Sequence, residues 1–103
     1  MEYKVFITDD YYYDINAACT YIENILKSPY ASNRLRNRVE QLINNLHIMP
    51  RMFQIIDKYD KVRRRYRRAI ANNYVMLYTV DEDDMVYVSH LYYDGRDYFN
   101  KLF

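Results

Sequence analysis

Two successive apolar stripes with helical spacing, with Ser28 and Pro29 between them, limit this chain to a small number of folds. The first stripe predicts a helix over residues 10–27, and the second stripe predicts a helix that ends near Pro50. Ser caps helices and Pro suits the first helical turn, so the pair marks the end of one helix and the start of the next. Two amphipathic helices joined by so short a turn are expected to form an antiparallel hairpin. The stripes consist of Ile15, Ala18, Cys19, Ile22, Ile25 and Leu26 in the first helix and Leu35, Val39, Leu42, Ile43 and Leu46 in the second.

The segments on either side of this hairpin have a different period. In residues 3–8, the apolar side chains of Tyr3, Val5 and Ile7 alternate with the other three side chains, and this period of two predicts a first strand. Residues 52–59 follow no regular pattern and are expected to form a loop. This loop should lead into a second strand from about Arg64 to Ile70.

Tight turns organise the remainder of the chain. Asn tolerates left-handed backbone angles, so Asn72-Asn73 is a good two-residue turn. The continuous apolar run 74–80 is typical of a central strand, and the polar residues 81–84 are expected to turn the chain into another strand at 85–92. A short terminal segment begins at Gly95.

The order of these elements indicates an α+β fold, with the helix hairpin packed on one face of an antiparallel sheet of about four strands. A chain of 103 residues has room for one domain, residues 1–103, and needs neither metal nor disulfide to stabilise its core. Cys19 lies in an apolar stripe and is expected to be core. The N-terminus lacks the apolar region of a secretory signal, and no run approaches the roughly 18 apolar residues of a membrane span. We therefore expect a cytoplasmic protein that makes no membrane contact.

The charges of the chain are strongly polarised. Residues 51–68 carry eight Lys and Arg against two Asp, a net charge of +6, whereas the rest carries seven against twelve, a net of −5. Such a field attracts a polyanion, either nucleic acid or an acidic protein segment. The alternative is a solvated sheet face whose Arg stems lie on apolar surface. The candidate residues for binding a target or a protein partner are Arg63, Arg64, Arg65, Arg67 and Arg68 in this run, together with Tyr93 and Tyr98.

A second set of candidates concerns catalysis. Cleavage of RNA through its own 2′-hydroxyl needs an acid and a base near the reacting oxygens and cations near the phosphate. Histidine suits the first task, so His90 is the candidate acid or base. The candidate phosphate clamps are Arg65, Arg67, Arg68 and Arg96, and the candidate positioning hydroxyl is that of Tyr93 or Tyr98. A lone strand histidine is otherwise structural, and the strand register decides whether His90 shares a face with the arginines.

No metal or cofactor is expected. The chain has neither a glycine-rich phosphate loop nor the spacing of zinc ligands. The acidic run Asp81–Asp84 is expected to be a solvated turn, because a metal site would need convergent ligands from elsewhere.

Several short segments along the chain form a recognisable set. They are residues 3–8, Asp14-Ile15, Tyr21-Ile22, residues 42–50, residues 66–70, residues 73–81 and residues 90–97. None is specific alone, but their order and spacing cover essentially the whole chain. Taken together, they resemble the RelE/ParE superfamily of bacterial type II toxins.

Within that superfamily the chain is more similar to ParE. Its ending Asp94-Gly95-Arg96-Asp97 resembles the Gly-Arg-Arg-Asp-like ending of ParE toxins, with Gly95 in place of the first arginine. Nuclease members carry an arginine just after the tyrosine that begins the third strand, where this chain has Val75. They also place a tyrosine near the C-terminus, where this chain ends Leu102-Phe103.

The resemblance implies the toxin of a bacterial type II toxin-antitoxin module, of the kind that arrests growth and stabilises plasmids. A cognate antitoxin would neutralise it in a hetero-oligomer, with an acidic or apolar segment covering the basic sheet surface and the helix hairpin. A ParE-like member would bind and poison DNA gyrase without chemistry of its own, and a RelE-like member would be an mRNA endonuclease at the ribosome. A non-toxic, toxin-derived binding module is a third alternative.

Overall fold

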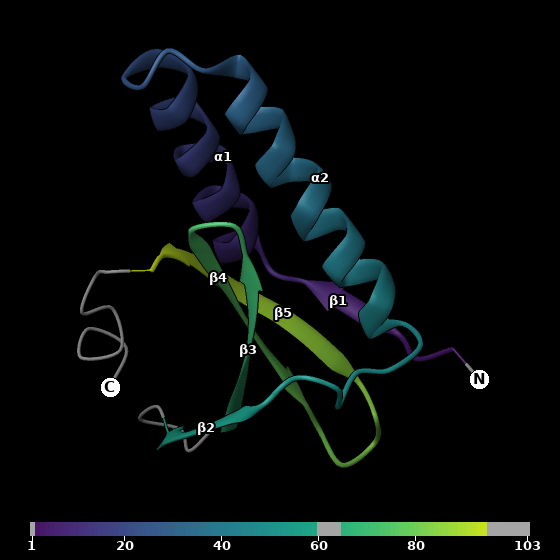
Figure 1. The fold of residues 1–103 in the computed structure, drawn as a ribbon. Coiled ribbons are helices and arrows are strands. Elements are labelled where there is room, and N and C mark those ends of the chain that lie inside the picture. Colours follow the sequence, from purple (N-terminus) through teal and green to yellow (C-terminus); the bar gives the residue numbers. More distant parts are fainter. Residues whose placement is uncertain (1, 60–64, 95–103) are drawn as a thin grey trace.

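The computed structural model describes residues 2–59 and 65–94. It confirms the α+β fold with a helix hairpin on one face of a sheet, and the joined ends of the helices project beyond the sheet (Figure 1). The elements in chain order are β1 (Val5–Ile7), α1 (Asp9–Asn24), α2 (Pro29–Leu46), β2 (Ile55–Tyr59), β3 (Arg65–Ala71), β4 (Tyr74–Val80) and β5 (Val86–Tyr93).

The sheet has five strands in the order β1-β5-β4-β3-β2 and is mixed rather than purely antiparallel. The strands β2 to β5 pair antiparallel, as a meander does, but β1 pairs parallel to β5. A parallel pair needs a long crossover, which the two helices between β1 and the meander supply. The prediction of a wholly antiparallel sheet was therefore wrong at one edge.

The predicted loop at residues 52–59 was also wrong in part, because residues 55–59 form β2. Its partners on β3 are Arg67 for Ile55 and Arg65 for Tyr59, with a shift in register between the two pairs. Such a shift interrupts the alternation by which a strand is recognised in sequence.

Local hydrogen bonds explain where the helices begin. The Thr8 hydroxyl accepts a hydrogen bond from the Tyr11 amide at 3.2 Å, and the Ser28 hydroxyl accepts one from the Ala31 amide at 3.2 Å. These contacts satisfy amides that have no partner within the helix. The helix α1 ends earlier than residue 27, and Lys27 turns the chain with a φ of 55°.

The main core lies between the hairpin and the sheet. Cys19, Leu42, Met76 and Val88 are fully buried there. Tyr78 is buried as well, and its hydroxyl donates to the Pro50 carbonyl at 2.7 Å. Burial raises the pKa of Tyr78 to about 12. The connector after α2, residues 47–54, is thereby tied to the middle of the sheet.

A second cluster lies on the other side of the sheet, which we call the helix-free face. It consists of Tyr66, Val75, Leu77 and Tyr92, all buried. Because both faces bury apolar groups, β4 reads as a continuous apolar run. In the described part of the chain, no helix is long and apolar enough to cross a membrane.

Candidate partner-binding groove and sheet face

Strand alternation divides the arginines of β3 between the two faces of the sheet. Arg67 pairs with Tyr78 on the helix side, and Arg68 pairs with Leu77 on the helix-free face. Arg65 is exposed at the start of β3. The other predicted basic residues, Arg63, Arg64 and Arg96, and also Tyr98, lie outside the described residues.

Arg67 is engaged in holding the connector. Its Nη1 donates to the carbonyl of Phe53 at 2.7 Å and to that of Arg51 at 3.2 Å. The connector is pinned at a third point by the Tyr78 hydroxyl described above. The side chain of Arg67 thus stabilises the path from α2 into β2.

His90 lies on the helix-free face, because a bulge at Ser89 shifts the alternation of β5. Leu77 pairs with His90 and the next residue, Tyr78, pairs with Val88. Arg68, Leu77 and His90 therefore form one row across three strands. The His90 ring also meets the Tyr66 ring edge to face, with centroids 6.2 Å apart. The structure brings His90 to the same face as Arg68 and does not bring it together with Arg67.

Asp14 of α1 is a site residue that sequence reasoning missed. Its Oδ2 accepts a hydrogen bond from the Leu91 amide at 3.0 Å and lies 3.8 Å from His90 Nδ1. Burial raises the pKa of Asp14, and the Leu91 hydrogen bond and His90 partly counter this shift. One feature of the sequence could have identified it. Asp14 precedes Ile15 at the border of an apolar stripe, and a partly buried carboxylate at such a position is expected to have a hydrogen-bond or ionic partner.

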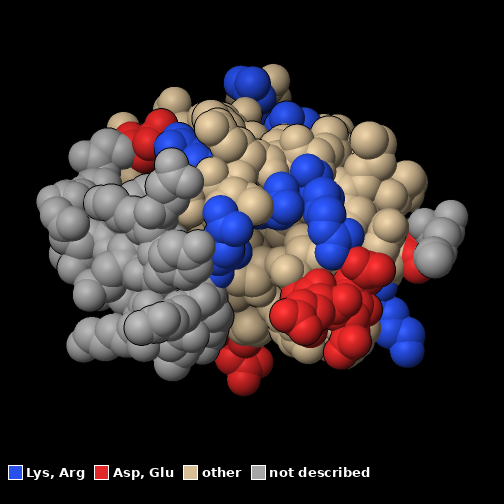
Figure 2. Space-filling view, turned by 90° about the horizontal axis from the view of Figure 1, so that it is seen from below, with Lys and Arg blue, Asp and Glu red and all other residues tan. Residues whose placement is uncertain are grey.

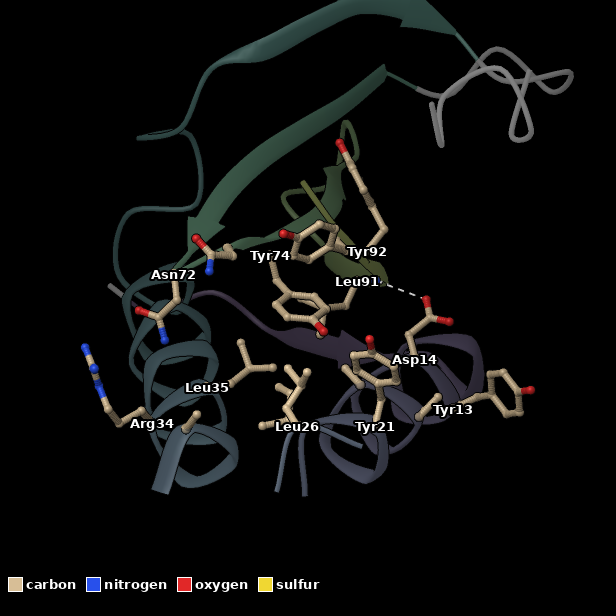
Figure 3. A pocket seen from close by; sticks show the side chains of 16 residues that line it. Tyr13, Asp14, Tyr21, Leu26, Arg34, Leu35, Asn72, Tyr74, Leu91 and Tyr92 are labelled. Atoms are coloured by element: carbon tan, nitrogen blue, oxygen red, sulfur yellow. Dashed lines mark hydrogen bonds between the residues drawn. The ribbon is translucent and has the colours of Figure 1, made fainter. Parts of the chain in front are cut away.

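A groove of about 1040 Å³ opens between the projecting hairpin and the end of the sheet that carries the β3–β4 turn. Tyr21, Leu26, Leu35 and Tyr74 lie in its middle, whereas Arg34 stands at its rim (Figure 3). Leu26 is 58% exposed and Tyr21 is 50% exposed. Exposed apolar side chains around a hollow of this size are typical of a surface that a partner covers.

Tyr93, predicted as a positioning hydroxyl or a binding residue, lines this groove. It lines the same hollow at the end of β5, and its ring packs edge to face on Tyr74 with centroids 5.6 Å apart. The turn at Asn72 and Asn73, where Asn72 has a φ of 57°, closes the groove from the sheet side. The apolar floor and polar rim suit a protein segment.

The opposite end of the molecule carries the acidic turn. Asp81 accepts hydrogen bonds from the amides of Asp83 and Met85, and Asp84 forms an ion pair with Arg51 at 2.6 Å. In the view from below, acidic and basic side chains lie side by side on this surface (Figure 2). Among the described residues, no three His, Cys, Asp or Glu side chains gather as metal ligands would.

Comparisons with known proteins show which family this chain resembles in sequence and in fold. A comparison with curated protein sequences finds no significant match. Among solved structures, a chain of the archaeal RelE-RelB complex from Pyrococcus horikoshii OT3 superposes with a TM-score of 0.59 at 21% sequence identity, covering 93% of this chain and 99% of that one. The family model of the ParE toxin of the type II toxin-antitoxin system parDE matches residues 5–98. The chain therefore belongs to the ParE toxin family of type II toxin-antitoxin systems.

Proposed function

We propose that this protein arrests bacterial growth in the cytoplasm and that a cognate antitoxin neutralises it by lying in the groove between the hairpin and the sheet. The observation that carries the proposal is the groove itself, whose middle exposes Tyr21 and Leu26. Water-exposed apolar groups gathered in a hollow gain free energy when a partner covers them.

The chemistry of the rim indicates the kind of segment that fits. Arg34 stands at the groove, and Arg36 and Arg38 are exposed on the same helix. The antitoxin segment is therefore amphipathic, with apolar side chains in the groove and carboxylates toward α2. The similar archaeal protein was crystallised as a RelE-RelB complex, which supports an antitoxin partner for this chain.

For the target we propose DNA gyrase, which the protein would poison by binding. Two observations support this choice over an enzymatic role. Arg67, a candidate for catalysis, donates to two backbone carbonyls and lies on the other side of the sheet from His90. Val75, at the position where nuclease toxins of the superfamily carry an arginine, is fully buried.

A second candidate is cleavage of mRNA at the ribosome. The row of Arg68 and His90 favours it, with Asp14 close to the His90 ring. An imidazole oriented by a carboxylate, with a guanidinium on the same face, has the components of general acid-base catalysis at a phosphate.

Inducible expression without the antitoxin separates these functions. Growth arrest with intact transcripts and an induced DNA-damage response is the result expected for gyrase. Codon-phased cuts in cellular mRNA, mapped by primer extension and abolished by His90→Ala, would instead establish the nuclease. Normal growth with soluble protein would refute both toxin activities and leave a non-toxic binding module.

Co-expression with the protein encoded by the neighbouring short reading frame tests the antitoxin. Restored growth together with co-purification is expected. A failure to bind that protein would contradict the proposed role of the groove, whatever the target is.

A further inference from the structure

The groove between the hairpin and the sheet carries opposite charges at its two ends. Among the described residues that line it, Asp14 has the only carboxylate and Arg34 the only guanidinium or ammonium group. The two side chains stand on opposite sides of the hollow, with Leu26, Leu35 and Tyr21 between them (Figure 3). A segment that fills the apolar middle therefore meets a negative group at one end and a positive group at the other.

The carboxylate of Asp14 is only partly satisfied within the chain. Its Oδ2 accepts from the Leu91 amide at 3.0 Å and lies 3.8 Å from His90 Nδ1, whereas Oδ1 accepts no hydrogen bond from the residues that the structure describes. Asp10, one turn earlier on α1, adds a like charge. At 18% exposure the Asp14 side chain is still open to water, which a partner in the groove would displace.

The loss of this water has to be compensated in the complex. An apolar segment laid against Asp14 would desolvate a charge that keeps a single hydrogen bond, and this is costly. A lysine or arginine at the same place would replace the water with charge-assisted hydrogen bonds. Tight binding therefore favours a cation opposite Asp14, as it favours a carboxylate opposite Arg34 at the other end.

We propose that the antitoxin segment in the groove places a lysine or arginine side chain against Asp14. This inference rests on the proposed function, since it takes the groove as the antitoxin site. The basic side chain and the carboxylate that meets Arg34 lie at opposite ends of the segment, with apolar side chains between them. The two charged contacts fix the direction of the segment, because the reverse direction would bring like charges together at both ends.

Calorimetric titration of Asp14→Asn with the antitoxin encoded by the neighbouring short reading frame tests the proposal through the sign of the effect. Asparagine keeps an acceptor for the Leu91 amide and removes the charge. With a cation against Asp14, the affinity of this variant should be at least about tenfold weaker than that of wild type. With apolar groups over Asp14, the variant would bind as tightly as wild type or more tightly, since no charge remains to be desolvated, and the proposal would be overturned.

Asp10→Asn is the matched control. It removes the same charge at an exposed position of α1 that does not line the groove, and it should change the affinity by less than about threefold. Circular dichroism and thermal melting establish that both variants are folded. Equal weakening by Asp10→Asn and Asp14→Asn would show a general effect of charge and would overturn the proposed contact.

Double-mutant cycles identify the partner group. Each lysine and arginine of the antitoxin is replaced in turn by glutamine and titrated against wild type and against Asp14→Asn. One replacement should weaken binding to wild type and have almost no effect on binding to Asp14→Asn, whereas additive losses at every position would refute the contact. Leu26→Asp, in the apolar middle, distinguishes two failures. Weakening by Leu26→Asp without weakening by Asp14→Asn refutes the cation alone, and no weakening by either refutes the groove as the antitoxin site.

Discussion

Asp14 is a partly buried carboxyl group whose ionisation opposes folding. Burial raises its pKa from the ordinary value of 3.8. The folded state therefore holds the proton more tightly than the unfolded chain does. The contribution of Asp14 to the free energy of unfolding is largest below the ordinary value and falls as pH rises through the interval up to the raised pKa.

Asp14→Asn tests this assignment, because asparagine keeps an oxygen that accepts from the Leu91 amide but does not titrate. Relative to this variant, the wild type should lose stability as pH rises from 3.8 upward. Urea unfolding at closely spaced pH values measures the difference. Asp14→Ala leaves the amide without its acceptor and should cost about 1–3 kcal/mol across the range. Parallel pH profiles of wild type and Asp14→Asn would contradict the assignment.

Arg67 and Arg68 are neighbours in sequence with different roles. Arg67→Ala removes two charge-assisted hydrogen bonds to the connector, and we expect a loss of about 1.5–3 kcal/mol in the free energy of unfolding. Arg68→Ala is the matched control, since Arg68 has no side-chain hydrogen bond or ion pair with another described residue, and it should stay within about 0.5 kcal/mol of wild type. Equal losses in chemical denaturation would show that Arg67 does not hold the connector.

At the scale of elements, the sequence predicted those parts that depend on neighbouring residues. The Ser28-Pro29 junction, the Asn72-Asn73 turn and the strand at residues 74–80 follow from capping, backbone angles and periodicity, and all three are present. The parallel pairing of β1 with β5 was missed, because the local sequence of a strand does not determine which strand it pairs with or in which direction. β2 was missed because its register shift breaks the alternation.

The site was less predictable than the fold for a related reason. A single extra residue at Ser89 decides which face His90 occupies, and nothing in the local pattern marks that bulge. The contact between Asp14 and the Leu91 amide joins residues 77 positions apart. The groove likewise combines two helix faces with a turn, so only the finished packing brings its residues together.

The proposed antitoxin site in the groove between the hairpin and the sheet can be tested by a substitution in its apolar floor. Leu26→Asp puts a carboxylate among apolar groups that the antitoxin is proposed to cover, and it should weaken antitoxin affinity by about ten- to a hundredfold. Ile48→Asp is the matched control, since Ile48 is 62% exposed near the end of α2 and outside the groove. Calorimetric titration with the co-purifying antitoxin measures both. Equal weakening by the two variants would place the antitoxin elsewhere.

At the scale of the whole molecule, the uneven distribution of charge is expected to affect the association of a partner more than its dissociation. The sequence has a net charge of +6 over residues 51–68 and −5 over the rest, so the field is directional although the total is only +1. An acidic partner is steered by that field during its approach. In the proposed complex, the partner seated in the groove is held by apolar contacts that salt does not screen. The association and dissociation rate constants should therefore respond differently to ionic strength.

Stopped-flow association with the antitoxin tests this separation. Raising the salt from about 50 to 500 mM shortens the screening length from about 14 Å to 4 Å, so the association rate constant should fall at least about tenfold. The dissociation rate constant should change little. Arg65→Gln, at an exposed position of the basic run, should flatten the salt dependence, whereas Lys4→Gln, which removes the same charge outside that run, should not. A dissociation rate constant that rises strongly with salt would contradict this expectation. It would show that ionic contacts, rather than the apolar floor of the groove, hold the antitoxin.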